Sequence, residues 1–265
     1  MSLIARGKPG RDDGGYTRLL GNSALGALIS RTHGASISAG TELEKLLLAR
    51  CQCLTAAELP TFLQNPTEGI FVVRKKVLKE TPFLDGRQEP DLLILKVVPN
   101  ERHCFVVELK DGDEFDTKKS DGERDSLYAF RDHIAAHIAF TVSVRVCAFN
   151  VEDRQRIVKG FKGRITEDEA ITGRELCHLL GVDYDEIVQL RKTDQQANFA
   201  FFLDELLRIP EVREELEARL SPSEGGGVDL IVGWMLRVPE IRAHIEGYLF
   251  APNPPRPAQE APSTH

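Results

Sequence analysis

Two short apolar runs, residues 92–95 and 104–107, constrain the fold of this chain more than any other feature. Each run has the length of a β-strand, and residues 97–103 supply turn residues between them, so the runs are predicted to pair as a hairpin. Asp91 begins the first strand and Glu108 ends the second. Antiparallel pairing therefore brings two carboxylates that are distant in the sequence to the same end of the sheet.

A third charged residue, Lys110, follows on the second strand. Because strand side chains alternate with a period of two, Glu108 and Lys110 project from one face while Leu109 points into the core. The carboxylates of Asp91 and Glu108, with the backbone carbonyl of Leu109, make a hard oxygen site that suits Mg²⁺ or Mn²⁺ and not zinc. Such an ion can lower the pKa of a bound water, and an ammonium beside it can orient that water. The pattern predicts metal-dependent phosphodiester hydrolysis.

The same residues carry a resemblance to a known family. Pro90-Asp91, a spacer and Glu108-Leu109-Lys110 match the PD...(D/E)xK signature. Roughly residues 38 to 150 resemble the nucleases of that superfamily, type II restriction endonucleases in particular. The resemblance implies an α/β fold with a restriction-endonuclease-like αβββαβ core, in which helices flank a mixed central sheet.

The resemblance also implies a function. A type II restriction endonuclease cleaves double-stranded DNA at a specific short sequence by Mg²⁺-dependent hydrolysis, with Mn²⁺ able to substitute. It acts with a cognate DNA methyltransferase in the cytoplasm of a bacterium or archaeon. A structure-specific repair or junction nuclease and a noncatalytic DNA-binding relative remain open, as does a surface hairpin whose Glu108 and Lys110 form only an exposed ion pair.

The remaining elements of the predicted core are read from periodicity and turn residues. They are a helix over residues 41–51 with Thr41 as its N-cap, a strand over 69–78, a helix over 123–140, a strand over 142–149 and a capped helix over 172–181.

A glutamate on the first of these helices is a further site candidate. The resemblance selects Glu44, four residues after Gly40, as a group that reaches the metal site. Glu42 remains the alternative, and the favourable placement of acids in a first helical turn explains both residues without chemistry.

Candidate DNA contacts come from two basic stretches. The net charge of −7 is unusual for a protein that binds a polyanion, but residues 194–265 hold six Lys+Arg against twelve Asp+Glu, so residues 1–193 are nearly neutral. A polar loop with the helical turn after it, and a basic segment predicted to be flexible (150–164), supply groups that could hold phosphate or read bases. The candidates are Lys118, Lys119, Ser120, Arg124, Arg154, Arg156, Lys159, Lys162 and Arg164.

Four regions are predicted: residues 1–37 as an arm with short helices, 38–193 as the nuclease core, 194–250 as a helical appendage and 251–265 as a disordered tail. The appendage contains a repeat, since residues 202–220 match residues 231–249, and both copies contain LR(I/V)PE(V/I)R. Each copy is predicted to break before its proline.

The appendage is also the candidate interface of a homodimer, because two antiparallel strands of DNA call for two sites related by a twofold axis. Its apolar candidates are Phe202, Leu206, Leu207, Trp234, Met235 and Leu236. No signal peptide or membrane span is predicted. The five cysteines are odd in number and lack paired spacing, so neither disulfides nor a zinc site is expected.

Overall fold

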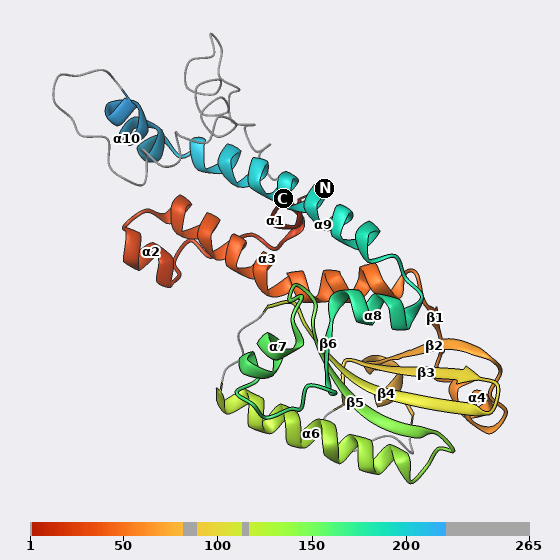
Figure 1. Cartoon of the computed structure of the whole chain (residues 1–265). Coiled ribbons are helices and arrows are strands. Elements are labelled where there is room, and N and C mark those ends of the chain that lie inside the picture. Colours follow the sequence, from red (N-terminus) through yellow and green to blue (C-terminus); the bar gives the residue numbers. More distant parts are fainter. Residues whose placement is uncertain (1, 82–88, 113–116, 221–265) are drawn as a thin grey trace. The chain divides into compact units, whose positions relative to one another are not determined.

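The computed structural model describes residues 2–81, 89–112 and 117–220 (Figure 1). Contacts divide the chain into two compact units. One unit is the continuous stretch Ser38–Arg191, and the other combines the chain before Ser38 with the chain after Arg191. The division into arm, core, appendage and tail stays a prediction.

The described part of the unit Ser38–Arg191 is built on a six-stranded sheet with the strand order β1-β2-β3-β4-β5-β6. β2, β3 and β4 pair antiparallel, whereas β1 pairs parallel with β2, and β4, β5 and β6 are parallel. The predicted mixed α/β sheet is confirmed. The strands are β1 Gln52–Cys53, β2 Gly69–Arg74, β3 Leu92–Val98, β4 Glu101–Lys110, β5 Thr141–Ala148 and β6 Ala170–Thr172.

The predicted hairpin forms, but its strands are longer and its turn is tighter than expected. Leu92 pairs with Val107, and the pairing continues to Val98 opposite Glu101. Only two residues, Pro99 and Asn100, connect the strands, and Asn100 has a φ of 65°. Proline followed by a residue of positive φ is typical of a type II turn. The prediction of a turn over 97–103 was therefore wrong, because the β-branched and charged residues there continue the ladder.

Both faces of the sheet are covered, which explains the unbroken apolar run in β3. Leu93 and Leu95 belong to one buried cluster, while Leu92 and Ile94 belong to the other. Figure 1 shows α6 and α7 on one side of the sheet, and α8 with the C-terminal part of α3 on the other. The helices around the sheet are α3 Ser23–Leu48, α4 Glu58–Gln64, α5 Lys75–Lys79, α6 Thr117–Ala135, α7 Arg154–Gly160, α8 Gly173–Leu180 and α9 Tyr184–Leu207.

Three element boundaries differ from the sequence prediction. Thr41 is no N-cap, because it lies inside α3, where burial of Leu43 and Leu47 against the sheet favours one continuous helix. The predicted strand over 69–78 ends at Arg74, and the basic residues after it form α5. The crossover helix α6 begins at Thr117 and not at residue 123.

The basic segment over 150–164 was predicted to be flexible, and this was wrong because it contains α7. Asp153 caps that helix by accepting a hydrogen bond from the Gln155 N–H at 2.9 Å, and Ile157 is fully buried beneath it. Short amphipathic helices of this kind have little periodicity to detect.

Other local predictions are confirmed. Thr172 and Glu175 form a reciprocal capping box at the start of α8, and Gly181 ends that helix at a φ of 69°. All five cysteines are free, and Cys104, Cys147 and Cys177 are buried as small apolar side chains.

The second unit is helical in its described part. It contains α1 Leu3–Arg6, α2 Gly15–Leu20, the first part of α3, the rest of α9 and α10 Pro210–Leu220. The break before proline is confirmed for the first repeat copy, since α9 ends at Leu207 and Pro210 opens α10. Leu207 is 1% exposed, so it does not offer the apolar surface expected of it. The second copy, residues 231–249, lies outside the described residues.

Gly26 allows α2 to pack closely against α3. A Cβ atom at this position would lie 2.2 Å from Thr17 Oγ1 and 2.6 Å from the Thr17 backbone nitrogen. We expect Gly26→Ala to destabilise the protein by about 1–3 kcal/mol despite the better helix propensity of alanine. Urea denaturation followed by circular dichroism measures this change.

Gly34, in the same helix, is the matched control. Outside the backbone of α3, no atom of the described residues lies within 4 Å of the position that a Cβ atom would take there. Gly34→Ala should therefore stabilise the protein by about 0.5–1 kcal/mol. Equal effects of the two substitutions would contradict the close helix contact.

Candidate active site

Asp91, Glu108 and Lys110 meet at one end of the β3–β4 pair. The register that pairs Leu92 with Val107 brings Asp91 beside the end of β4, and the Leu109 N–H donates a hydrogen bond to Asp91 Oδ2 at 2.9 Å. The three side chains line a cavity of about 350 Å³. Its other lining residues are Lys75, Glu89, Leu109, Glu123, Ser126 and Leu127.

Two carboxylates hold the Lys110 ammonium. Lys110 Nζ lies 2.7 Å from Glu108 Oε1 and 2.9 Å from Glu123 Oε1. Burial lowers the pKa of Lys110, but the charges and hydrogen bonds of the two glutamates outweigh it and raise this pKa. Lys110 is therefore a cation, and the pair is more than an exposed surface ion pair because the side chains are only 14–27% exposed.

The negative charge of the Glu108 carboxylate is unfavourable in its surroundings. Burial, followed by repulsion from Asp91, raises its pKa from 4.5 to about 7, while the Lys110 ammonium opposes the shift. Negative charge is thus concentrated at this end of the sheet, and a cation bound there would relieve it.

Glu44 and Glu42 have different surroundings. Burial and then the charge of Asp91 raise the pKa of Glu44, and Arg74 opposes that shift. Glu44 is therefore electrostatically linked to the carboxylates, although it does not line their cavity. Glu42 instead pairs with Lys45 of its own helix at 2.8 Å.

Lys75, Glu89 and Glu123 are charged residues of the cavity that were not assigned to the site from the sequence. Lys75 Nζ lies 3.7 Å from Asp91 Oδ1, and the Lys75 N–H donates to the Asp91 carbonyl at 3.2 Å. Glu123 comes from α6. Its position four residues before the buried Leu127 is the one sequence signal that could have placed it on the inner face of that helix.

A comparison with known proteins adds an independent observation. The chain is 41% identical over 219 residues to the Type II restriction enzyme HhaII of Haemophilus parahaemolyticus, and the match covers 78% of this chain and 95% of that protein. The chain belongs to the type II restriction enzymes. No protein-family model and no solved structure matches it. This similarity confirms the prediction of a restriction endonuclease, which is a DNA-cleaving hydrolase. It favours this function over the alternative of a repair or junction nuclease.

Three of the basic residues expected to contact DNA in this restriction enzyme have partners within the protein. Arg154 pairs with the capping-box residue Glu175 at 2.6 Å, and Arg164 pairs with Asp121 at 2.7 Å. The guanidinium of Arg124 lies 4.9 Å from the ring centroid of Tyr128.

The structure describes the side chains of only some of the other candidates. Arg156, Lys159 and Lys162 are exposed. The side chains of Lys118, Lys119 and Ser120 lie outside the described part of the chain.

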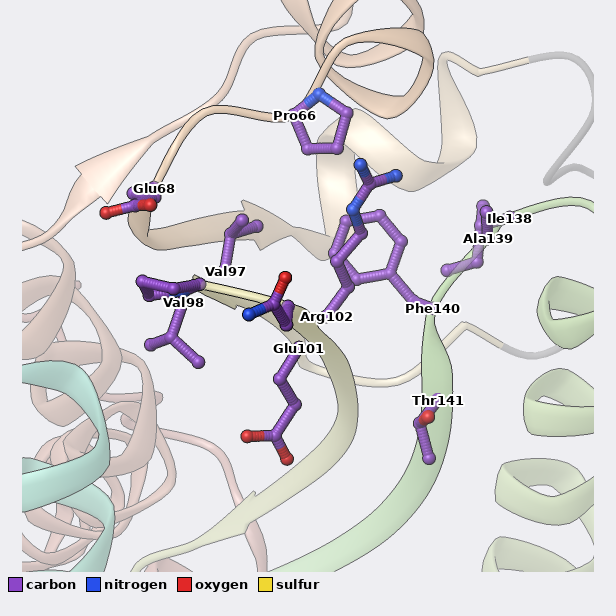
Figure 2. A pocket seen from close by; sticks show the side chains of 12 residues that line it. Pro66, Glu68, Val97, Val98, Glu101, Arg102, Ile138, Ala139, Phe140 and Thr141 are labelled. Atoms are coloured by element: carbon purple, nitrogen blue, oxygen red, sulfur yellow. The ribbon is translucent and has the colours of Figure 1, made fainter.

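A larger cavity, of about 720 Å³, lies at the turn of the β3–β4 hairpin, at the end away from Asp91 and Glu108 (Figure 2). It surrounds the turn at Pro99 and Asn100, and its lining includes Glu68, Arg102 and Phe140. The carboxylates therefore lie in the smaller cavity, at the other end of β3 and β4. Within the described residues, no helix has the length and apolar character needed to span a membrane.

Glu108 makes the stability of the restriction enzyme depend on pH. Its folded pKa is raised, so the folded state binds more protons than the unfolded state between about pH 4.5 and 7, and stability falls as pH rises through that window. In EDTA, Glu108→Gln should stabilise the protein by about 1–3 kcal/mol near pH 8 and much less near pH 5. Urea denaturation at both values measures the difference.

The exposed Glu68 provides the control for this measurement. Glu68→Gln should change stability by less than about 0.5 kcal/mol at either pH, as a surface substitution does. A gain from Glu108→Gln that is equal at both pH values would contradict the buried charge.

Proposed function

We propose that this restriction enzyme cleaves double-stranded DNA at one short sequence by Mg²⁺-dependent hydrolysis at a PD-(D/E)xK site. Asp91 and Glu108, with the carbonyl oxygen of Leu109, would hold the ion, and Lys110 would stabilise the charge that develops. One observation carries the proposal: Asp91, Glu108 and Lys110 meet at one end of the β3–β4 pair. There the Asp91 carboxylate accepts a hydrogen bond from the Leu109 N–H.

The available donors fit a hard divalent cation. All of them are oxygen atoms, and burial with repulsion from Asp91 raises the pKa of Glu108, a cost of negative charge that a bound cation relieves. Among the described residues, no three acidic, histidine or cysteine side chains form a complete metal site. Water is thus expected in the shell, as Mg²⁺ prefers, and Mn²⁺ should substitute. The bound ion would supply Lewis acidity at the phosphoryl group.

Lys110 has a role set by its charge. An ammonium held by Glu108 and Glu123 donates hydrogen bonds and accepts none, so it can orient water or a phosphoryl oxygen but cannot take up a proton. We assign it the orientation of the nucleophile and the stabilisation of the developing negative charge, and not the role of general base.

Glu44 is proposed as a further acid of the site, in preference to Glu42. The influence of Asp91 on the pKa of Glu44 supports this choice, and so does the separate ion pair between Glu42 and Lys45. Glu44 would act on water in the ion's shell, because it does not line the cavity that holds Asp91 and Glu108.

DNA contacts are proposed for the two basic stretches. Exposed Arg156, Lys159 and Lys162 on and after α7 are suited to phosphate. Arg154 and Arg164 would first have to leave their carboxylate partners. For Lys118, Lys119, Ser120 and Arg124 the assignment follows from their place at the start of α6, the helix that also carries Glu123 to the site.

A homodimer is the assembly we propose. One chain supplies one set of cutting groups, whereas a duplex presents two antiparallel phosphodiesters, and a twofold dimer matches the symmetry of a palindromic target. Phe202 and Leu206 are half-buried on α9 and could join the interface; Trp234, Met235 and Leu236 lie outside the described residues. A cognate DNA methyltransferase that protects the same sequence is the expected partner in the cell.

Removal of any one of the three central groups should abolish cleavage. Asp91→Ala, Glu108→Ala and Lys110→Ala should each lower the single-turnover rate by at least about 10³-fold, because the groups act as one unit. Digestion of a fully sequenced phage DNA in Mg²⁺ gives the reference: the unmodified enzyme should produce discrete fragments. Full cleavage by a folded Asp91→Ala or Glu108→Ala variant would refute the site.

Neighbouring acids serve as the matched comparison. Glu44→Gln should slow cleavage, whereas Glu42→Gln on the same helix should leave it near the unmodified rate. Ca²⁺ should support DNA binding without efficient cutting, since it is larger and more flexibly coordinated.

The dimer is tested by light scattering at micromolar concentration, with and without a duplex that the enzyme cuts. A mass near twice 29.6 kDa for the protein component is expected at least on DNA. A monomer in both conditions that still cuts both strands would mean sequential nicking and would remove the dimer from the mechanism.

A further inference from the structure

The Lys110 ammonium is held from two directions by groups on different elements. Glu108 lies two residues before it on β4, whereas Glu123 reaches it from α6. The two N–O distances, 2.7 and 2.9 Å, are both those of charge-assisted hydrogen bonds. Glu123 is therefore bound to Lys110 as directly as Glu108 is.

The carboxylate of Glu123 is anchored by the packing of its helix. One turn further along α6, Leu127 is 3% exposed, and Phe130 and Ile134 follow it into the core beneath the sheet. Leu127 and Ser126 line the same cavity as Glu123. The position of Glu123 therefore depends on α6 and not on the strand that carries Lys110.

Glu108 cannot hold the ammonium equally well once a metal ion is bound. In the proposed site Glu108 is a ligand of a divalent cation, and two positive groups on one carboxylate repel each other. Lysine has a flexible four-carbon stem, so an ammonium that loses one partner can swing away. A second carboxylate outside the metal shell would prevent this.

We infer that Glu123 is a positioning residue, which holds the Lys110 ammonium at the reacting end of β4 while Glu108 coordinates the metal ion. The inference rests on the site proposed above. Glu123 touches Lys110 and acts through it, so it adds no ligand to the metal and no group to the reaction itself.

Glu123→Gln tests this role, because it keeps the size of the side chain and removes its charge. We expect the single-turnover cleavage rate at saturating Mg²⁺ to fall about 10- to 100-fold, the usual effect of losing a group that orients a reacting residue. The affinity for Mn²⁺ alone and the affinity for DNA in Ca²⁺ should stay within about twofold. Asp132→Asn is the matched control on α6, since Asp132 is exposed and pairs with Arg131.

Nuclear magnetic resonance provides a readout that does not depend on cleavage. In the Ca²⁺ complex with DNA, the Lys110 ammonium should give a protected proton–nitrogen signal, assigned by its absence from Lys110→Gln. Glu123→Gln should remove that signal through fast exchange with water, while Asp132→Asn should retain it.

A double substitution separates this role from the alternatives. Lys110→Gln with Glu123→Gln should cleave at the same residual rate as Lys110→Gln alone, because Glu123 acts only through the lysine. A further loss in the double variant, or weaker Mn²⁺ binding by Glu123→Gln, would mean that Glu123 is a metal ligand and would overturn the inference.

The remaining outcomes are also distinct. Full activity of Glu123→Gln with a loss in Lys110→Gln would overturn only the role of Glu123. Cleavage by Lys110→Gln at the unmodified rate would overturn the proposed site as well. A lower melting temperature of Glu123→Gln, with a normal rate at low temperature, would leave Glu123 as a structural ion pair and refute the positioning role.

Discussion

The register of the β3–β4 pair is the constraint on which the site depends. Leu92 opposite Val107 brings Asp91 to the end of β4, and a slip of one residue would turn Glu108 and Lys110 to the other face of the sheet. Burial of β3 on both faces prevents such a slip, because the Leu93 side and the Leu92 side each fill a separate core cluster. The apolar packing of the centre thus sets the geometry of the charged end.

The charged side chains at this end of the sheet lower the stability of the folded protein. Burial, together with repulsion from Asp91, raises the pKa of Glu108 to about 7. Lys75 and Lys110 offset part of this repulsion. A sheet buried on both faces can hold such a cluster where a small exposed hairpin could not, and a cation bound at the proposed site would relieve the repulsion.

The charge balance of the rest of the chain fits an enzyme that must discriminate among DNA sequences. The overall charge is −7, and several arginines near the sheet are neutralised by carboxylates. Examples are Arg154 with Glu175, Arg164 with Asp121 and Arg191 with Asp111. A surface without net positive charge limits attraction to any polyanion, so binding depends more on contacts to particular bases.

The sequence by itself determined the hairpin, the meeting of Asp91 with Glu108 and Lys110, the strand β5 and the caps of α8. These follow from periodicity, strand direction and capping chemistry, which are local properties. Only the tertiary structure decided that α3 runs through Thr41, that residues 75–79 are helical and that Glu123 reaches Lys110. Each of these depends on what a segment packs against. Burial can override a local helix signal, and a contact between residues 13 positions apart on different elements has no local pattern.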